Sequence, residues 1–449
     1  MKRTTFTLTL LSAAIATVAL AQDPISLRIV SIGDSYAAGE GNPNGTAANG
    51  AAIWSSTPCH RSINNGRRIA ANRINDLPNV SVSFSDFSCT GAGINDGLLT
   101  SMTSSAPETP NTVVGPQLTA VANTNGNLPI DILMVSIGGN DVGFAPVVKE
   151  CMLPTDCRTS PVVLNAIQRI TSVLPQRYDN LAPQIANLNP RFVYITEYPN
   201  VLKRKDGVFC GGFDDLFVPT GDLAGMAMRF LSQEESEFLL ERFIRPLNDQ
   251  IQAAAARHGW RYIAGPEDTF APHGFCNASG QRWVNTLGDS FIRQGTHTGT
   301  AHPNVEGHRA YADSLIRRAT LDFNLPLESP RIVDIRERNA GLDVPIATPG
   351  FRKEVRAEIS QVPSTLTATL QFRFRRLVET SVPAFVNLNM TDAGAGRLNL
   401  FQGTVPGSET LLPGERIEYR VRATSSFNGQ SRTTTTSIRS ITLGEVLDQ

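Results

Sequence analysis

The sequence has almost no net charge, because 40 lysine and arginine residues stand against 41 aspartate and glutamate residues. Proteins that bind nucleic acid through its phosphates usually carry a basic excess, so the composition does not favour that class. The six cysteines form no C-x-x-C pair, which argues against a cysteine-based zinc or redox site. After residue 20 there is also no apolar run of the roughly 20 residues that a membrane-spanning helix needs.

The first residues have the pattern of an export signal. A basic start at Lys2 and Arg3 precedes an apolar stretch over residues 6–20, and an A-x-A site ends at Ala21. The apolar stretch is shorter than a spanning helix requires. We therefore expect a signal peptide over residues 1–21 and a secreted or periplasmic mature protein without a transmembrane segment.

The cysteines of an exported chain are expected to form disulfides. Six cysteines allow many pairings, and sequence alone does not decide among them. Pairing of neighbours along the chain is our preferred hypothesis, and it gives Cys59–Cys89, Cys151–Cys157 and Cys210–Cys276.

Short apolar runs alternate with helical segments over residues 27–323, which predicts an α/β domain with a doubly wound, mostly parallel five-stranded sheet. The expected strands are residues 27–32, 79–87, 130–137, 191–196 and 260–264. Helices are expected before residue 75, over residues 161–188, from a capping box at Ser232 to about residue 258, and after Pro303.

The pattern changes after residue 325, where long helical periodicity ends. Alternating polar and apolar runs predict a smaller all-β domain of the immunoglobulin or fibronectin III type. We expect a catalytic domain over residues 22–325 and a β-sandwich over residues 326–449. The β-sandwich carries no evident catalytic constellation, so an accessory role, such as attachment to a polysaccharide or a surface, is expected. Its expected strands are residues 352–359, 365–374, 384–390, 415–423 and 431–443.

Candidate chemical residues follow the first three strands and precede the last helix of the α/β part. The carboxyl ends of parallel strands meet at one sheet edge, where such folds bind ligands. The motifs are Gly33-Asp34-Ser35, Gly91, Gly138-Gly139-Asn140-Asp141 and His302-Pro303-Asn304. In this order they resemble the four blocks of the SGNH (GDSL-type) hydrolases over residues 27–323.

This resemblance implies a flavodoxin-like fold and hydrolysis of carboxylic esters without a cofactor or metal. Ser35 would be the nucleophile and His302 the general base. The backbone N–H groups of Ser35 and Gly91 and the side-chain amide of Asn140 would form the oxyanion hole. A glycine suits position 91 because a side chain there could crowd an approaching acyl group.

The sequence departs from the family at one position. Many members carry an aspartate three residues before the catalytic histidine, and here that residue is Gly299. The chain therefore resembles a subset of disulfide-containing bacterial esterases that use a Ser–His dyad, in which a main-chain carbonyl orients the histidine. We expect the Gly299 carbonyl to do so, with a distant carboxylate, Asp34 or Asp289, as the alternative.

Other histidines and a second motif copy offer competing readings. His308 could replace His302 as the base, but its place within the expected helix favours a structural role. Spacing of His297, His302 and His308 matches no common zinc pattern. Gly288-Asp289-Ser290 repeats the first motif but follows no long apolar strand, so we interpret it as loop sequence.

The favoured function is that of a secreted esterase or lipase acting on a small-molecule or lipid ester. One alternative is a deacetylase of acylated polysaccharide, and another is a non-catalytic binding or adhesion protein built on the same scaffold. Chain-length preference would depend on residues 37–57 and 206–225, where candidate acyl contacts or core residues are Phe209, Phe213, Leu216 and Phe217.

Overall fold

The computed structural model describes residues 24–153, 155–211, 231–339, 353–360, 365–379, 381–393, 400–405 and 415–442. The expected signal peptide lies outside these residues. So do three of the candidate acyl contacts, Phe213, Leu216 and Phe217.

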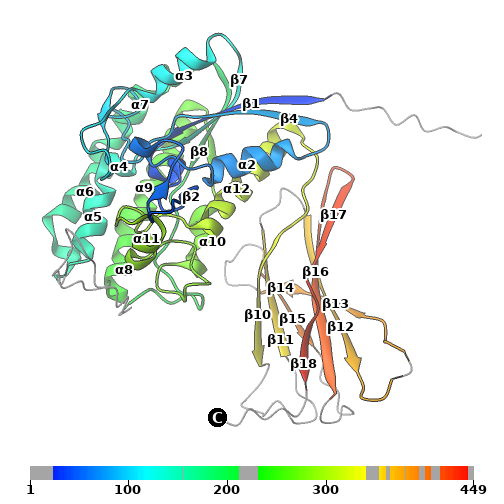
Figure 1. The fold of residues 1–449 in the computed structure, drawn as a ribbon. Helices are drawn as coiled ribbons and strands as arrows, with labels where there is room; N and C mark the ends of the chain where they lie inside the picture. The colour runs from blue at the N-terminus through cyan, green and yellow to red at the C-terminus, as the bar shows by residue number, and fades with distance from the viewer. Residues whose placement is uncertain are drawn as a thin grey trace, which may run out of the picture.

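A five-stranded sheet forms the centre of the α/β part, as the sequence predicts (Figure 1). Its strand order is β4-β1-β7-β8-β9, and every neighbouring pair is parallel. This order places the carboxyl ends of β4, β1 and β7 next to one another. The strands are β1 (Ile25–Gly33), β4 (Val80–Asp86), β7 (Ile130–Ser136), β8 (Pro190–Thr196) and β9 (Arg261–Ile263).

Helices cover both faces of this sheet because successive strand residues point to opposite sides. Ile29 packs with α2 (Gly66–Asn75) and α12 (Val305–Phe323) in one buried cluster. Ile32 belongs to the cluster on the other face. Figure 1 shows the two helical layers on either side of the sheet. The second layer includes α3 (Gln117–Asn125), α6 (Pro161–Ser172), α7 (Leu174–Ala186) and α9 (Arg245–His258).

Two helical expectations need correction. The stretch over residues 161–188 is two helices, α6 and α7, and Pro175 lies in the first turn of the second, where a proline is tolerated. The second Gly-Asp-Ser motif is not a loop but begins α11 (Leu287–Gln294), because Thr286 and Asp289 form a capping box. The capping box at Ser232 is confirmed, and it opens α8 (Gln233–Leu239).

Shorter helices complete the α/β part near the candidate site. They are α1 (Ser35–Ala38), α4 (Gly139–Val142), α5 (Phe144–Cys151) and α10 (Pro266–Phe270). A π-helical segment, Leu240–Ile244, joins α8 to α9. The loop after α1 contains only the two-residue strands β2 (Gly45–Thr46) and β3 (Ala52–Ile53).

The carboxyl-terminal part contains two antiparallel sheets that share one buried core. The sequence predicts β11, β12, β13 and β16, gives β17 and β18 as one strand, and misses β10, β14 and β15. One sheet consists of β10 (Ile332–Asn339), β11 (Lys353–Ile359), β15 (Leu400–Val405) and β14 (Thr391–Asp392). The other consists of β13 (Val386–Asn389), β12 (Thr365–Arg375), β16 (Arg416–Phe427), β17 (Gln430–Thr435) and β18 (Arg439–Thr442).

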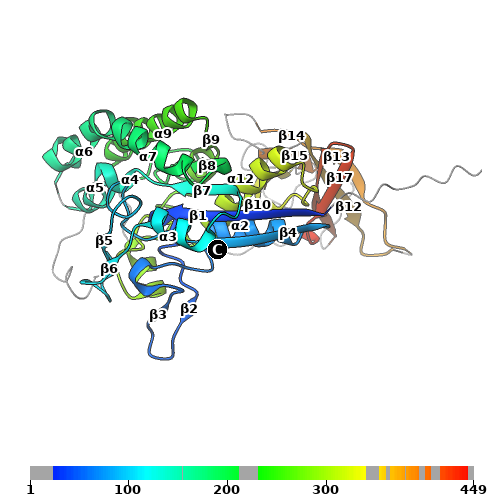
Figure 2. The same ribbon diagram turned by 90° about the horizontal axis from the view of Figure 1, so that it is seen from above.

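Polar contacts join the all-β part to α12 and to the turn after α10, and Figure 2 shows the two parts from above. Arg331 bonds Asp313 of α12 at 2.7 Å. Nε2 of the buried His273 lies 3.1 Å from both carboxylate oxygens of Glu358 on β11. The second part therefore packs on the helical layer formed by α12.

The six cysteines are joined as expected, in the order Cys59–Cys89, Cys151–Cys157 and Cys210–Cys276. The cross-links close chain segments of very different length, with sequence separations of 30, 6 and 66 residues. A longer closed segment removes more conformational entropy from the unfolded chain.

Unequal contributions of the disulfides to stability follow from these separations. Replacing Cys210 and Cys276 by serine should lower the free energy of unfolding by about 4 kcal/mol, whereas replacing Cys151 and Cys157 should lower it by about 2 kcal/mol. Denaturant unfolding of both double variants measures the difference. An equal loss in the two variants would contradict the loop-entropy argument.

Candidate active site

Four residues singled out from the sequence line one cavity of about 570 Å³. Ser35 is the first residue of α1, immediately beyond the end of β1. Gly91 follows β4, and Asn140 lies in α4 beyond β7. His302 comes from the loop before α12. Three adjacent strand ends and one distant loop thus converge on a single space.

The turn that presents Ser35 is fixed by its two preceding residues. Gly33 has φ 137°, and a Cβ atom there would lie 2.1 Å from the carbonyl oxygen of Ser136 on β7. The Asp34 carboxylate caps α1 by accepting from the Tyr36 N–H at 3.1 Å. It also accepts from the hydroxyls of Ser136 and Tyr198. Burial raises the pKa of Asp34 to about 6.

His302 and Ser35 form a direct hydrogen bond. The distance from Nε2 of His302 to Oγ of Ser35 is 2.7 Å, and Nδ1 of His302 lies 3.0 Å from the Thr300 carbonyl oxygen. Because a carbonyl only accepts, Nδ1 must carry the proton in neutral imidazole. Nε2 is then the acceptor for the Ser35 hydroxyl, which is the tautomer that a general base requires.

The expected role of Gly299 is wrong, because the Thr300 carbonyl contacts the ring. The Gly299 carbonyl instead accepts the backbone N–H of His302 at 3.1 Å. Between them Ala301 has φ 62°, a left-handed turn that is rare for alanine. Gly299 is needed for space, since a Cβ atom there would lie 2.8 Å from Cα of Gly41.

The two carboxylates considered as alternatives have other partners. Asp289 bonds the Arg282 guanidinium at 2.7 and 3.0 Å and caps α11. Asp34 caps α1, as described above. Neither carboxylate is bonded to the His302 imidazole. His308 is also outside the site: it is buried within α12, and its Nδ1 accepts the backbone N–H of Gly66 at 3.2 Å.

The candidate oxyanion donors are held by their neighbours. Gly91 has φ 81°, and a Cβ atom there would overlap Oγ of Ser105 at 1.7 Å. Asn140 donates one amide hydrogen to the Ala92 carbonyl at 2.9 Å and retains a second. Within the described ranges, no hydrogen bond engages the backbone N–H of Ser35 or Gly91. Two N–H groups and one amide hydrogen thus remain for a ligand.

Asp141 fixes the short helix that carries Asn140. Its carboxylate accepts the Ile94 N–H at 3.0 Å and pairs with Arg177. Arg169 donates to the Asp141 carbonyl. A buried carboxylate with charged and backbone donors is strongly oriented, so the neighbouring amide has little freedom.

Sequence reasoning missed three residues that shape the site. Tyr36 packs its ring 5.0 Å from the His302 ring and donates its hydroxyl to the Ala301 carbonyl at 2.8 Å. Thr300 supplies the carbonyl that orients the histidine. Glu40 is fully buried beside the cavity. Position next to Ser35 could have indicated Tyr36, and a lone acid in a glycine-rich loop could have indicated Glu40.

Known proteins resemble this chain in sequence. A model of the GDSL-like Lipase/Acylhydrolase family matches residues 31–310, more than half of the chain. The chain belongs to this family. It is an ester hydrolase with the five-stranded α/β fold expected of that family.

Relatives are found among lipases of Streptomyces. Lipase 1 of Streptomyces coelicolor is 24% identical over 273 residues, which cover 61% of this chain and 81% of the relative. A lipase of Streptomyces rimosus is 25% identical over 259 residues, covering 58% and 76%. A solved structure of an extracellular lipase from Streptomyces rimosus has a TM-score of 0.45 at 22% identity and covers 64% of this chain and 98% of that one.

The environment of His302 predicts how activity depends on pH. Burial lowers the pKa of His302 below its ordinary value of 6.5, although the charge of Glu40 opposes this shift. A general base must be neutral, so kcat/KM for a soluble ester should fall only at pH values below about 6.5. The acidic limb of the pH–rate profile tests this. A limb clearly above pH 6.5 would contradict it.

Proposed function

We propose that this chain hydrolyses esters of medium-length acyl chains with a Ser35–His302 dyad, and that no acidic triad member takes part. The observation that carries the proposal is the 2.7 Å hydrogen bond between Oγ of Ser35 and Nε2 of His302. The donors at Gly91 and Asn140 line the same cavity. Nucleophile, base and oxyanion donors are the three requirements of acyl transfer.

In the acylation step, Nε2 of His302 takes the hydroxyl proton as Oγ of Ser35 attacks the ester carbonyl carbon. The carbonyl electrons move onto oxygen, and the N–H groups of Ser35 and Gly91 and the Asn140 amide bind this oxyanion. The imidazolium then gives its proton to the leaving alkoxide as the ester C–O bond breaks. The products are free alcohol and an acyl group on Ser35.

In the deacylation step, water attacks the acyl carbon and gives a proton to His302. The bond between that carbon and Oγ breaks, and the proton returns to Ser35. The free carboxylic acid leaves and the dyad is restored. The Thr300 carbonyl accepts the Nδ1 proton throughout, so it holds the ring in one orientation.

An apolar cavity of about 110 Å³ supports a medium acyl chain rather than acetate. It shares residues with the cavity at Ser35, including Phe144, Val148 and Leu287. Each methylene buried there is worth about 0.8 kcal/mol. An acetyl group is too short to use this space, so the cavity favours an esterase or lipase over a deacetylase of polysaccharide. Other lining residues are Val147, Cys151, Leu202, Leu239, Phe243 and Phe275.

Export and domain organisation are part of the same proposal. The basic and apolar pattern of residues 1–21, together with three disulfides, supports secretion of the mature enzyme. Among the described helices, none is long and apolar enough to cross a bilayer. Residues 22–325 would form the catalytic domain. Residues 326–449, with their own buried core, would form an accessory domain for attachment to a polymer or surface.

Substitution of each dyad member tests the mechanism. Ser35→Ala and His302→Ala should each lower kcat on a soluble nitrophenyl ester by at least about 10³-fold, because the acyl-enzyme can no longer form efficiently. His308→Ala provides a histidine control outside the cavity, and circular dichroism confirms folding. A folded Ser35→Ala variant with wild-type turnover would exclude this nucleophile, and an inert wild type would favour a binding protein.

Narrowing the apolar cavity tests the acyl-chain preference. Leu239→Trp should lower kcat/KM for an octanoate ester by about tenfold or more, because Leu239 lines the apolar cavity but not the cavity at Ser35. Hydrolysis of the acetate ester should change little. Val162→Trp is the matched control, since Val162 is 41% exposed on α6 and lines neither cavity. Equal losses on both esters would show that the chain does not occupy this cavity.

A further inference from the structure

A fully buried carboxylate lies beside the dyad and takes no part in the steps above. Glu40 is 0% exposed, and its backbone N–H donates to the Ser35 carbonyl at 3.2 Å. Burying a charged group is costly unless hydrogen bonds and opposite charge compensate. The hydrogen-bond partners of the Glu40 side chain therefore indicate its role.

Four side chains bond the Glu40 carboxylate. His60 Nδ1 lies 2.8 Å from Oε2, and the Thr90 hydroxyl donates to the same oxygen at 2.7 Å. The Gln294 amide donates to Oε1 at 2.6 Å, and the Thr298 hydroxyl donates to it at 2.8 Å. Each carboxylate oxygen thus has partners from different segments of the chain.

Two of these partners belong to loops that carry the candidate catalytic groups. Thr90 directly precedes Gly91, a proposed oxyanion donor that lines the cavity. Thr298 lies two residues before Thr300, the residue that orients His302. We call the segment of Thr90 and Gly91 the oxyanion loop, and residues 295–304 the histidine loop. One carboxylate, that of Glu40, therefore connects these two loops.

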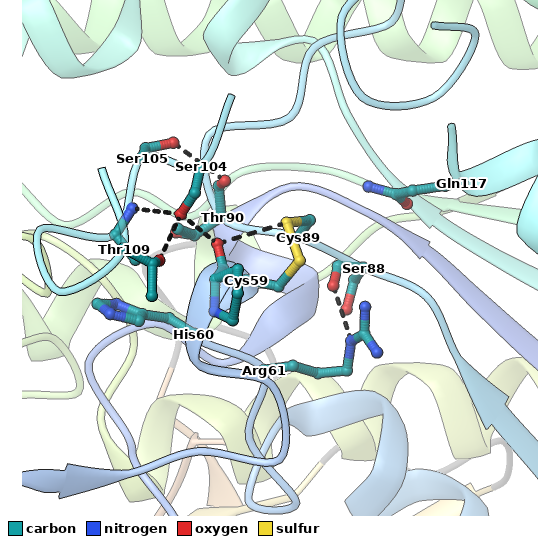
Figure 3. The surroundings of a disulfide bond; sticks show 12 residues. Cys59, His60, Arg61, Ser88, Cys89, Thr90, Ser104, Ser105, Thr109 and Gln117 are labelled. Carbon is teal, nitrogen blue, oxygen red and sulfur yellow. Dashed lines mark hydrogen bonds between the residues drawn. A yellow bond between two sulfur atoms is a disulfide. The ribbon is translucent and has the colours of Figure 1, made fainter. Parts of the chain in front are cut away.

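The oxyanion loop is also held by contacts that do not involve Glu40. Thr90 N–H donates to the Cys59 carbonyl at 3.0 Å, and the Cys59–Cys89 disulfide joins the same two segments (Figure 3). His60 follows Cys59 directly, so the ring that bonds Glu40 is anchored at this cross-link. Removing the carboxylate would free the Thr90 side chain but leave the backbone bond and the disulfide.

The carboxylate is charged. Although burial alone raises the pKa of Glu40, the hydrogen bond and charge of His60 lower it to about 2. Both ring nitrogens of His60 face carboxylates, because Nε2 lies 2.8 Å from Oε2 of Glu108. His60 therefore holds two protons and a positive charge, and it stacks on Trp54 with ring centroids 4.4 Å apart.

Charge near His302 matters because this ring lacks an acidic partner. Its Nδ1 faces the neutral Thr300 carbonyl, yet the ring becomes an imidazolium during each step of ester hydrolysis. The charged groups that act on it are the Glu40 carboxylate, which favours the imidazolium, and the His60 imidazolium, which opposes it. The effect of Glu40 is the larger of the two.

We propose that Glu40 is a positioning residue for ester hydrolysis: it ties the loop of Gly91 to the loop of His302, and its charge stabilises the His302 imidazolium. This role rests on the proposed Ser35–His302 dyad. It differs from the role of a triad acid, because Glu40 acts through Thr90, through Thr298 and through its field, without touching the imidazole.

Glu40→Gln tests the proposal, with Glu108→Gln as the matched control on the other side of His60. In Glu40→Gln, kcat on a short-chain nitrophenyl ester should fall by about 10²-fold, with KM changing less than about threefold. The acidic limb of kcat/KM should move to lower pH, because the imidazolium has lost a stabilising charge. Glu108→Gln should keep both the rate and the limb close to wild type.

The outcomes separate this proposal from the dyad. A folded Glu40→Gln variant with wild-type kcat and an unmoved limb would overturn the role of Glu40, while Ser35→Ala reports on the dyad independently. A lower kcat without a shifted limb would reject the electrostatic part. If Glu40→Gln does not fold, Thr90→Val and Thr298→Val should each lower kcat about tenfold with the limb unmoved. Wild-type kcat in both variants would show that Glu40 does not act by connecting these two loops.

Discussion

The contact between Ser35 and His302 joins residues that are 267 positions apart, and the rest of the α/β part serves to make it. Ser35 is placed by β1 and the cap of Asp34, whereas His302 depends on the loop before α12. Tyr36 links the two, because its backbone belongs to the serine helix while its hydroxyl bonds the Ala301 carbonyl. A contact over this distance forms only when the whole sheet and its covering helices are in place.

The site orients its histidine without placing a carboxylate on the ring. A carbonyl acceptor at Thr300 fixes the tautomer as well as a carboxylate would, and it avoids desolvating a second charge at the same point. In the proposed mechanism, the His302 imidazolium is then less stabilised at close range. Glu40 provides a negative charge farther away, where His60, Thr90, Gln294 and Thr298 satisfy it. In this proposal the Thr300 carbonyl orients the His302 ring, whereas Glu40 stabilises the charge on it.

Sequence patterns predicted the parts of the site that follow strand ends, because strand alternation and the motifs at residues 33–35 and 138–141 are local signals. The same reasoning failed at Gly299, since the left-handed conformation of Ala301 moves the acceptor by one residue and alanine gives no sign of it. It also missed Glu40, whose importance comes from partners 20 to 258 residues away. The loop expected at residues 288–290 is wrong, because the lack of a preceding strand does not exclude a helix, and Thr286 and Asp289 begin one.

The disulfides lie beside the walls of the two cavities. Cys89 precedes the oxyanion loop, and Cys151 itself lines the apolar cavity at the end of α5. Cys276 follows Phe275, another lining residue. The sheet is held instead by backbone pairing between neighbouring strands. Loops have few backbone partners and open readily, so covalent links at their ends would hold the cavity walls in position. The cross-links would therefore hold the cavity walls in addition to stabilising the fold.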